Sequence, residues 1–153
     1  MTLLETIRTF EAVAGRQPSV KTIVRNDIFR LNTLPDVRYG VFAWMQREHT
    51  ITADLHTYSF VFYYVDRLTA DKGNEIEVQS VGIQTLGNIL ASLEALGVYP
   101  EADWTAQVFN QRFLDECAGV FASVRLQVPA DWVCPESWPD FNDSEFNDDF
   151  NIV

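Results

Sequence analysis

The two histidines are the residues of this chain whose type and spacing could carry chemistry. His49 and His56 flank a short polar segment, with Glu48 and Asp54 beside them. Imidazole and carboxylate are ordinary metal ligands, so a metal site across two neighbouring strands is one interpretation. A polar hairpin tip is the other, because turns favour such residues without any metal. The spacing follows none of the usual zinc-ligand patterns, and we expect no bound metal.

Cys117 could act as a nucleophile only if a histidine lay beside it, and both histidines belong to another part of the sequence. The alternative is a small buried apolar residue, which is the common role of a cysteine without partners. Asp115 and Glu116 form an adjacent acidic pair, a pattern typical of a turn that faces water. Glycine-rich phosphate loops of either common type are absent from the sequence. We therefore expect no cofactor and no enzymatic activity.

Composition places the chain among ordinary globular proteins, with 153 residues and a hydrophobic fraction of 47%. No stretch approaches the roughly 20 apolar residues of a membrane span, so we expect no membrane insertion. The first residues, MTLLETIRTF, lack the basic and apolar regions of a signal peptide. Two cysteines do not make a disulfide framework. These features together favour synthesis in a reducing cytoplasm.

The formal net charge of −11 is unevenly distributed. Six of the 22 acids lie from Glu136 onward, where there is no lysine or arginine. The preceding residues are only mildly acidic, and sequence-specific nucleic-acid binding is not expected because it needs basic surface. We divide the chain into a domain at residues 1–135 and an acidic C-terminal arm at residues 136–153.

The arm also carries aromatic residues at regular intervals, namely Trp138, Phe141, Phe146 and Phe150. The unit Phe-Asn-Asp occurs twice in it, which makes the arm too polar to fold alone. One interpretation is a solubilising, disordered end. The other, which we favour, is a segment that becomes ordered on a partner protein, with aromatic anchors in pockets and acids near arginines.

Two helices and several strands can be read from the rest of the sequence. Thr2 and Glu5 have the form of a capping box, and apolar residues at helical spacing predict a helix over residues 2–14. Asn74 and Glu77 indicate the start of a longer helix that ends near Gly97. Shorter strands are predicted within residues 19–31, 104–113 and 118–128. The inward residues of the last strand should be Val120, Ala122, Val124, Leu126 and Val128.

Residues 39–66 form two long β-type runs around a short polar segment, which predicts a β-hairpin with its tip near Thr52–Asp54. Both faces of its second arm are apolar. Since a single core layer covers one face only, we expect helices or a neighbouring subunit to cover the other. The hairpin residues assigned to such an oligomer interface are Tyr58, Phe60, Phe62 and Tyr64.

The element order predicts an α+β fold, with a mostly antiparallel sheet that carries its helices on one face. The chain resembles a known family in two segments of its sequence. These are FVFYYVDRL, which follows the predicted hairpin turn, and FNQRFLDECAGVFASVRLQVPADWVC. The family consists of small neck proteins of tailed phages that infect gut Bacteroidetes, the crAss-like phages and their relatives. The element order is also similar to phage tail-terminator and tail-completion proteins. The matching positions are Phe113, Ala118-Gly119, Val128-Pro129, Asp131 and Cys134.

The resemblance covers residues 1–135 and implies a structural virion protein, made in the bacterial cytoplasm, that forms a homo-oligomeric ring where head meets tail. Neighbouring neck, portal or tail proteins would be its partners, and the family offers no catalytic residues. Two other classes of function stay open. One is an acidic inhibitor that imitates nucleic acid, which would need its acids spread over one folded face. The other is a small enzyme that uses the residues at the hairpin tip.

Overall fold

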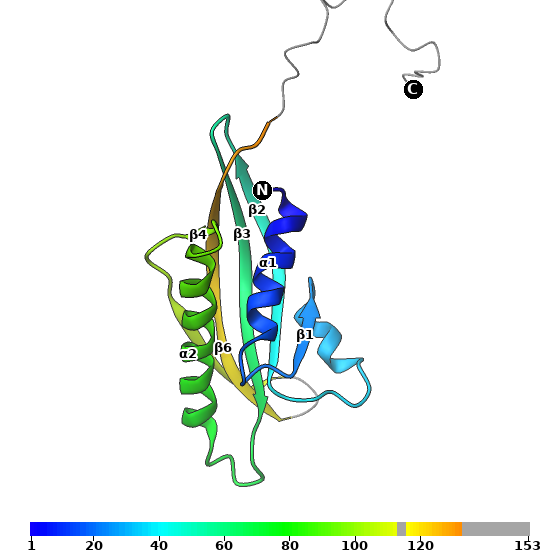
Figure 1. The fold of residues 1–153 in the computed structure, drawn as a ribbon. Coiled ribbons are helices and arrows are strands. Elements are labelled where there is room, and N and C mark those ends of the chain that lie inside the picture. The colour runs from blue at the N-terminus through cyan, green and yellow to red at the C-terminus, as the bar shows by residue number, and fades with distance from the viewer. Residues whose placement is uncertain (113–115, 133–153) are drawn as a thin grey trace, which may run out of the picture.

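A computed structural model describes residues 1–112 and 116–132 as a strongly twisted β-sheet with two α-helices on one face (Figure 1). The predicted arm residues Trp138, Phe141, Phe146 and Phe150, and the proposed boundary after residue 135, lie outside the described residues. In chain order the elements are α1 (Leu3–Gly15), β1 (Thr22–Arg25), the 3₁₀ helix η1 (Ile28–Asn32), β2 (Val41–Ile51), β3 (Leu55–Arg67), α2 (Glu75–Glu94), β4 (Tyr99–Pro100), β5 (Ala106–Arg112) and β6 (Cys117–Pro129).

The sheet has the order β1-β2-β3-β6-β4, and β5 also pairs with β6. Strands β2 and β3 form the predicted hairpin, with its turn at residues 52–54, and β3 pairs with β6 over its whole length. The pairs β2–β3, β3–β6, β4–β6 and β5–β6 are antiparallel, whereas β1 runs parallel to β2. The predicted α+β class, mostly antiparallel sheet and single helical face are therefore confirmed. The strand predicted within residues 19–31 is β1, but its parallel direction and the two-residue strand β4 were not expected from the sequence.

Helix α1 begins where its capping box predicts. The Thr2 hydroxyl accepts a hydrogen bond from the Glu5 backbone amide, and the Glu5 carboxylate accepts one from the Thr2 amide at 2.6 Å. The helix then turns Phe10 and Ala14 completely into the core. These reciprocal bonds satisfy amide groups that a helix start otherwise leaves without partners.

Glu11 fixes α1 to the sheet through a partly buried cluster. Its carboxylate accepts two hydrogen bonds from the Arg25 guanidinium, each at 2.7 Å, and one from the Trp44 indole at 2.9 Å. The contact with Glu11 raises the pKa of Arg25. The cluster thus joins α1, β1 and β2 with a charge-assisted fork.

Helix α2 begins directly after Asn74, as the sequence predicts, although the Asn74 side chain makes no cap hydrogen bond. The Asn74 side chain turns back to accept a hydrogen bond from the Thr69 amide at 2.8 Å, and it makes no cap bond to the helix. At the other end the chain reverses at Gly97, whose φ of +80° suits glycine because no β-carbon is present. The sequence therefore located the start of this helix correctly.

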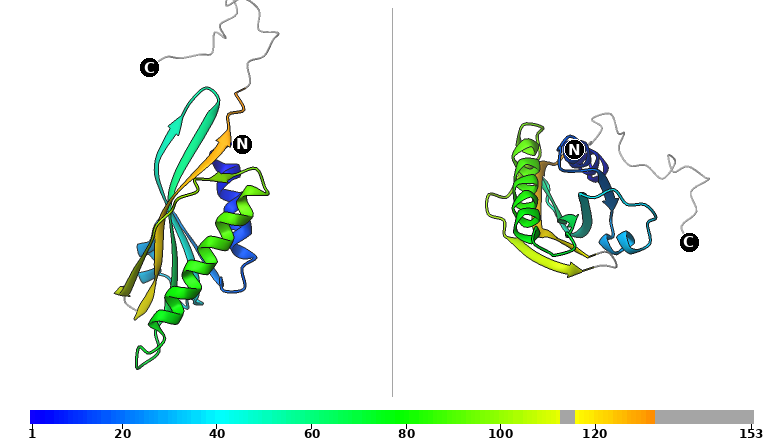
Figure 2. Two further views of the ribbon diagram at one scale, coloured as in Figure 1. Left: turned by 90° about the vertical axis from the view of Figure 1, so that its left-hand side faces the viewer. Right: turned by 90° about the horizontal axis from the view of Figure 1, so that it is seen from below.

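The main core lies between the sheet and the two helices, as Figure 2 shows from the side and from below. All five β6 residues predicted to face inward belong to it: Val120, Ala122, Val124, Leu126 and Val128. Gly82 is the point of closest approach of α2, because a β-carbon there would lie 2.7 Å from Val120 Cγ2 and 2.9 Å from Tyr64 Cδ1. A residue without a side chain is thus required for the helix to reach the sheet.

The opposite face of the sheet is covered in part by η1 and the segment that follows it. Ile28 and Leu31 of η1 pack with Val24, Val41 and Val65 in a second, smaller core. From the sequence we expected either helices or a neighbouring subunit to cover this second face. Near the base of the hairpin the answer is a short internal segment of the same chain.

Candidate functional site

The four hairpin residues assigned to an oligomer interface are buried inside the subunit. Tyr58, Phe60, Phe62 and Tyr64 are at most 4% exposed and lie in the main core beneath the helices. Burial together with Asp66 raises the pKa of Tyr64 to about 12, so its hydroxyl stays protonated and can donate to the Ser19 carbonyl at 3.4 Å. In this fold these four side chains are not available to a neighbour, and the choice of interface residues is corrected accordingly.

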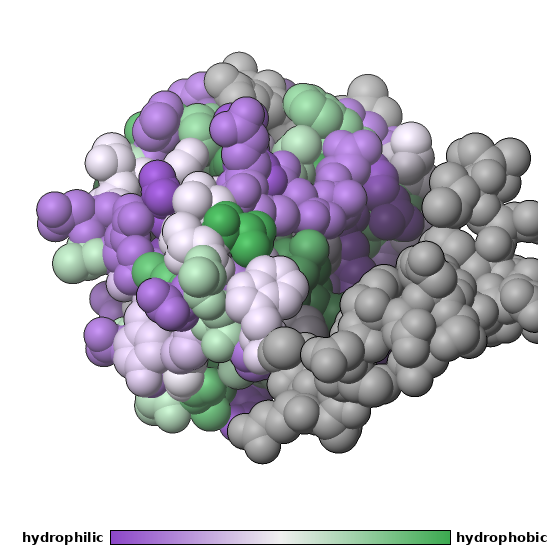
Figure 3. Space-filling view, turned by 90° about the horizontal axis from the view of Figure 1, so that it is seen from above, coloured by the Kyte–Doolittle hydropathy of each residue, from purple (hydrophilic) through white to green (hydrophobic). Residues whose placement is uncertain are grey.

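The end of the hairpin projects beyond both helices (Figures 1 and 2). Seen from above, this end of the molecule shows a small hydrophobic patch within a mostly hydrophilic surface (Figure 3). Among the residues near the tip, Ile51 is 49% exposed and Trp132 is 66% exposed. Exposed apolar side chains on a projecting hairpin are available for contact with another chain.

Both histidines lie on this projecting end and are held by hydrogen bonds within the hairpin. His49 Nδ1 accepts a bond from the Ser59 amide at 3.1 Å, and its Nε2 lies 3.2 Å from the Gln46 side-chain oxygen. Partial burial lowers the pKa of His49. His56 Nδ1 lies 2.8 Å from the Tyr58 hydroxyl, and its buried Nε2 has no hydrogen-bond partner among the described residues. Within residues 1–112 and 116–132, no three side chains of metal-binding type come together.

Cys117 lies far from both histidines. It is buried at the start of β6, opposite Arg67, whereas His56 lies opposite Val128 at the other end of the same strand pair. Arg67 and His56 are eleven positions apart on β3, which corresponds to about 36 Å of extended strand. The structure therefore does not assemble the cysteine–histidine pair that the sequence raised as a possibility. Glu116, the residue before Cys117, forms an ion pair with Lys72 at 3.6 Å.

A set of contacts that the sequence did not reveal holds the last described residues, 130–132, against the hairpin tip. The Ala130 amide donates to the Asp54 carbonyl at 3.0 Å, and the Trp132 ring packs on His56 with centroids 4.9 Å apart. Asp131 binds the amino group of Met1 at 2.8 Å, and this contact lowers the pKa of Asp131. We call these three residues the arm root, because they fix the place where residues 133–153 begin.

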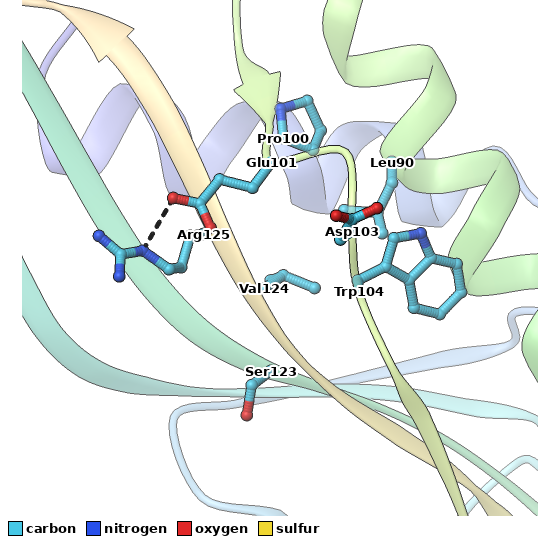
Figure 4. Close-up of a pocket in the computed structure, with 8 residues that line it drawn as sticks. All are labelled: Leu90, Pro100, Glu101, Asp103, Trp104, Ser123, Val124 and Arg125. Carbon is cyan, nitrogen blue, oxygen red and sulfur yellow. Dashed lines mark ion pairs between the residues drawn. The ribbon is translucent and has the colours of Figure 1, made fainter.

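A hollow of about 150 Å³ opens between β6 and the segment that connects β4 to β5 (Figure 4). Arg125 and Glu101 lie together on one side of it, and their ion pair has an N–O distance of 3.1 Å. Trp104 closes the hollow towards α2, where a β-carbon added at Gly87 would lie 3.7 Å from its ring. Within this hollow the guanidinium of Arg125 is therefore already paired with Glu101.

The sheet has two unlike open edges on opposite sides. On one side, β1 pairs with Val41–Trp44 only, so the rest of β2 as far as Ile51 has no strand on the side away from β3 in the described part of the chain. On the other side, β5 pairs with β6 alone, and Val108 on it is 57% exposed. Exposed edge strands are the places where a second chain most readily adds to a sheet.

No protein-family model and no curated protein matches this chain. Among the described residues, neither helix is long and apolar enough to cross a bilayer.

Proposed function

We propose that the chain is a structural subunit of the neck of a tailed phage, where copies form a ring between the portal and the tail. The resemblance of residues 1–135 to phage neck and tail-completion proteins supports this role. Its partners would be further copies of itself and neighbouring neck, portal or tail proteins. The proposed role needs no cofactor and no sequence-specific contact with DNA.

One structural observation carries the proposal, namely the pair of unlike open edges. A contact between the open part of β2 in one copy, residues 45–51, and β5 in the next copy would be head-to-tail. A row of copies joined in this way would still have an open β2 edge at one end and an open β5 edge at the other. Repetition of such a contact gives a ring when the rotation between copies closes. The projecting hairpin, with exposed Ile51 and Trp132 near its tip, would enlarge this contact.

Quantitative mass spectrometry of purified virions tests the proposal. We expect this chain in the particle at several copies for each portal assembly, and we expect it to remain with the neck when heads and tails are separated. Absence from the virion, or a single copy in each particle, would refute the ring.

A further inference from the structure

We propose that the outer groove of α1, lined by Arg8 and Arg16, is the docking site for the acidic arm, residues 136–153, of an adjacent copy. This inference rests on the proposed ring and names the surface that receives the arm. The groove has a volume of about 370 Å³ and is lined by Arg8, Thr9, Ala12, Val13, Arg16 and Leu96.

The groove combines two cations with an apolar floor. Arg8, Ala12 and Arg16 follow one another at intervals of four residues, so they lie along one side of the helix, with the small side chain of Ala12 between the arginines. Leu96 stands beside them and is 49% exposed. A small residue between two arginines, with an exposed leucine beside them, forms a seat for an aromatic ring flanked by carboxylates.

The positive charge of this groove is not neutralised by nearby acids. No acidic side chain lines it, and neither arginine has an ion pair within the described part of the chain. The two acids of α1 are used elsewhere, since Glu5 caps the helix and Glu11 binds Arg25 and Trp44. A further hollow of about 400 Å³ lies beside the hairpin, between residues of β2, β3 and β6. It is a poorer site, because Glu48 lines it and its Arg125 already pairs with Glu101.

The arm has the complementary composition and spacing. It carries six acids and no bases, with acid–aromatic–acid units at Asp140-Phe141-Asp143 and Glu145-Phe146-Asp149. The outer acids of these units stand three and four residues apart, or about 10 and 13 Å in an extended chain. Arg8 and Arg16 are separated by about 12 Å along the helix axis, at 1.5 Å for each residue.

The arm is also long enough and begins in a suitable place. The arm root lies at the end of the molecule where α1 begins, since Asp131 contacts Met1. Eighteen extended residues span about 60 Å, which reaches past the width of one subunit to its neighbour. Each copy that joins the ring brings its own groove and its own arm, so the same contact can be repeated from copy to copy.

The test measures binding of a dye-labelled peptide with the sequence of residues 136–153 by fluorescence anisotropy. The receptor is the full-length chain with Phe141, Phe146 and Phe150 changed to serine, so that its own arm does not compete. We expect saturable binding that weakens at higher salt. Adding Arg8→Glu and Arg16→Glu to the receptor should weaken it at least about tenfold, or roughly 1.4 kcal/mol.

The matched control is Arg30→Glu with Arg38→Glu. These two arginines are also exposed and have no ion pair in the described residues, and their reversal changes the net charge equally on a different surface. We expect the control receptor to bind within about twofold of the starting receptor. Circular dichroism confirms that each variant is folded.

Equal weakening in both pairs of variants would show a general effect of charge and overturn the docking site. Binding that survives the Arg8 and Arg16 reversal, or no binding at millimolar receptor, would overturn it as well and leave the groove to another neck protein. Failure here is distinguishable from failure of the ring, because copy number in the virion is measured without the peptide.

Discussion

Glu11 brings a carboxylate into the contact between α1 and the sheet. This carboxylate accepts the hydrogen bond of the Trp44 indole N–H. The Trp44 side chain is buried, so its donor has no access to water if the carboxylate is removed. An unsatisfied buried donor costs about 1–3 kcal/mol. The energetic role of Glu11 is therefore tied to its partner and can be isolated by changing both residues.

We predict that Glu11→Ala lowers the free energy of unfolding by about 1–3 kcal/mol in the wild-type background. In a Trp44→Phe background the same substitution should cost clearly less, because no indole N–H is left without an acceptor. Urea denaturation of the four proteins gives the coupling energy. Strict additivity of the two substitutions would contradict this account of the cluster.

Glu5 makes the stability of α1 depend on pH. Hydrogen bonds from the backbone and side chain of Thr2 lower the pKa of its carboxyl in the folded protein. The unfolded chain therefore binds a proton at a higher pH than the folded chain does. The stabilisation is fully present above the ordinary glutamate pKa, and it is lost as the pH falls through the lowered folded value.

Glu5→Gln tests this dependence, because glutamine can still accept the cap bond and cannot titrate. At pH 7 the wild type should melt at a higher temperature than the variant, since a charged acceptor near a helix N-terminus is the stronger one. The difference in Tm should shrink as the pH is lowered towards 2. A difference that stays constant over this range would show that the carboxylate charge does not matter for the cap.

The sequence predicted several residue roles correctly where the chemistry is local. The capping box of Thr2 and Glu5 is visible as a pattern of two residues, and the alternation along β6 shows which side chains face the core. The roles of Tyr58 and Tyr64 were assigned wrongly, because an apolar strand with two covered faces does not show which face the helices take. The Glu11 cluster was missed since its partners lie on three elements.

At the scale of elements, the two glycines of α2 make opposite contributions. Gly82 lies against Tyr64 and Val120, where an added β-carbon would be closer than 3 Å to both. Gly87 has only the Trp104 ring in its vicinity, at 3.7 Å from the position of an added β-carbon. Sequence alone treats both as weak points of a helix, whereas the structure gives one of them a packing role.

We predict that Gly82→Ala destabilises the protein by about 1–3 kcal/mol, because the helix must move away from the sheet. Gly87→Ala should stabilise it by about 0.5–1 kcal/mol, through the higher helix propensity of alanine. The two variants are matched controls for one another in thermal and urea denaturation. If both changed the stability in the same direction, the packing of α2 on Tyr64 would be wrong.

The positions of the longer elements were predictable because each carries a complete local signal. The hairpin has two β-type runs around a polar turn, and α2 has an apolar stripe that ends at Gly97. The segment that contains η1 gave no such signal, because only Ile28 and Leu31 face inward and a single turn has no period to detect. Coverage of the second sheet face therefore had to come from the structure.

At the scale of the whole molecule, the proposed ring depends on the arm as well as on the sheet edges. Burying one phenylalanine contributes about 1.5–3 kcal/mol, whereas ordering the backbone costs about 1–2 kcal/mol for each residue. One aromatic anchor cannot hold eighteen residues, so several must bind together. The acids would guide the arm to a basic surface and add contacts with arginine.

We therefore predict that changing Phe141, Phe146 and Phe150 to serine impairs assembly of the chain into virions more than changing Asp143, Glu145 and Asp148 to their amides. Western blotting of purified particles measures the incorporated fraction for each variant. Normal incorporation of the serine variant combined with failure of the amide variant would make the arm an electrostatic device and reject the aromatic anchors.

The central claim is that copies of this chain close into a ring in the phage neck, and cryo-electron microscopy of the neck of the virion tests it most directly. We expect density for this fold repeated around the tail axis, with the open part of β2 in each copy beside β5 of the next and further density in the groove of Arg8 and Arg16. A single copy beside the portal, or a hairpin surrounded by solvent in every copy, would contradict the account.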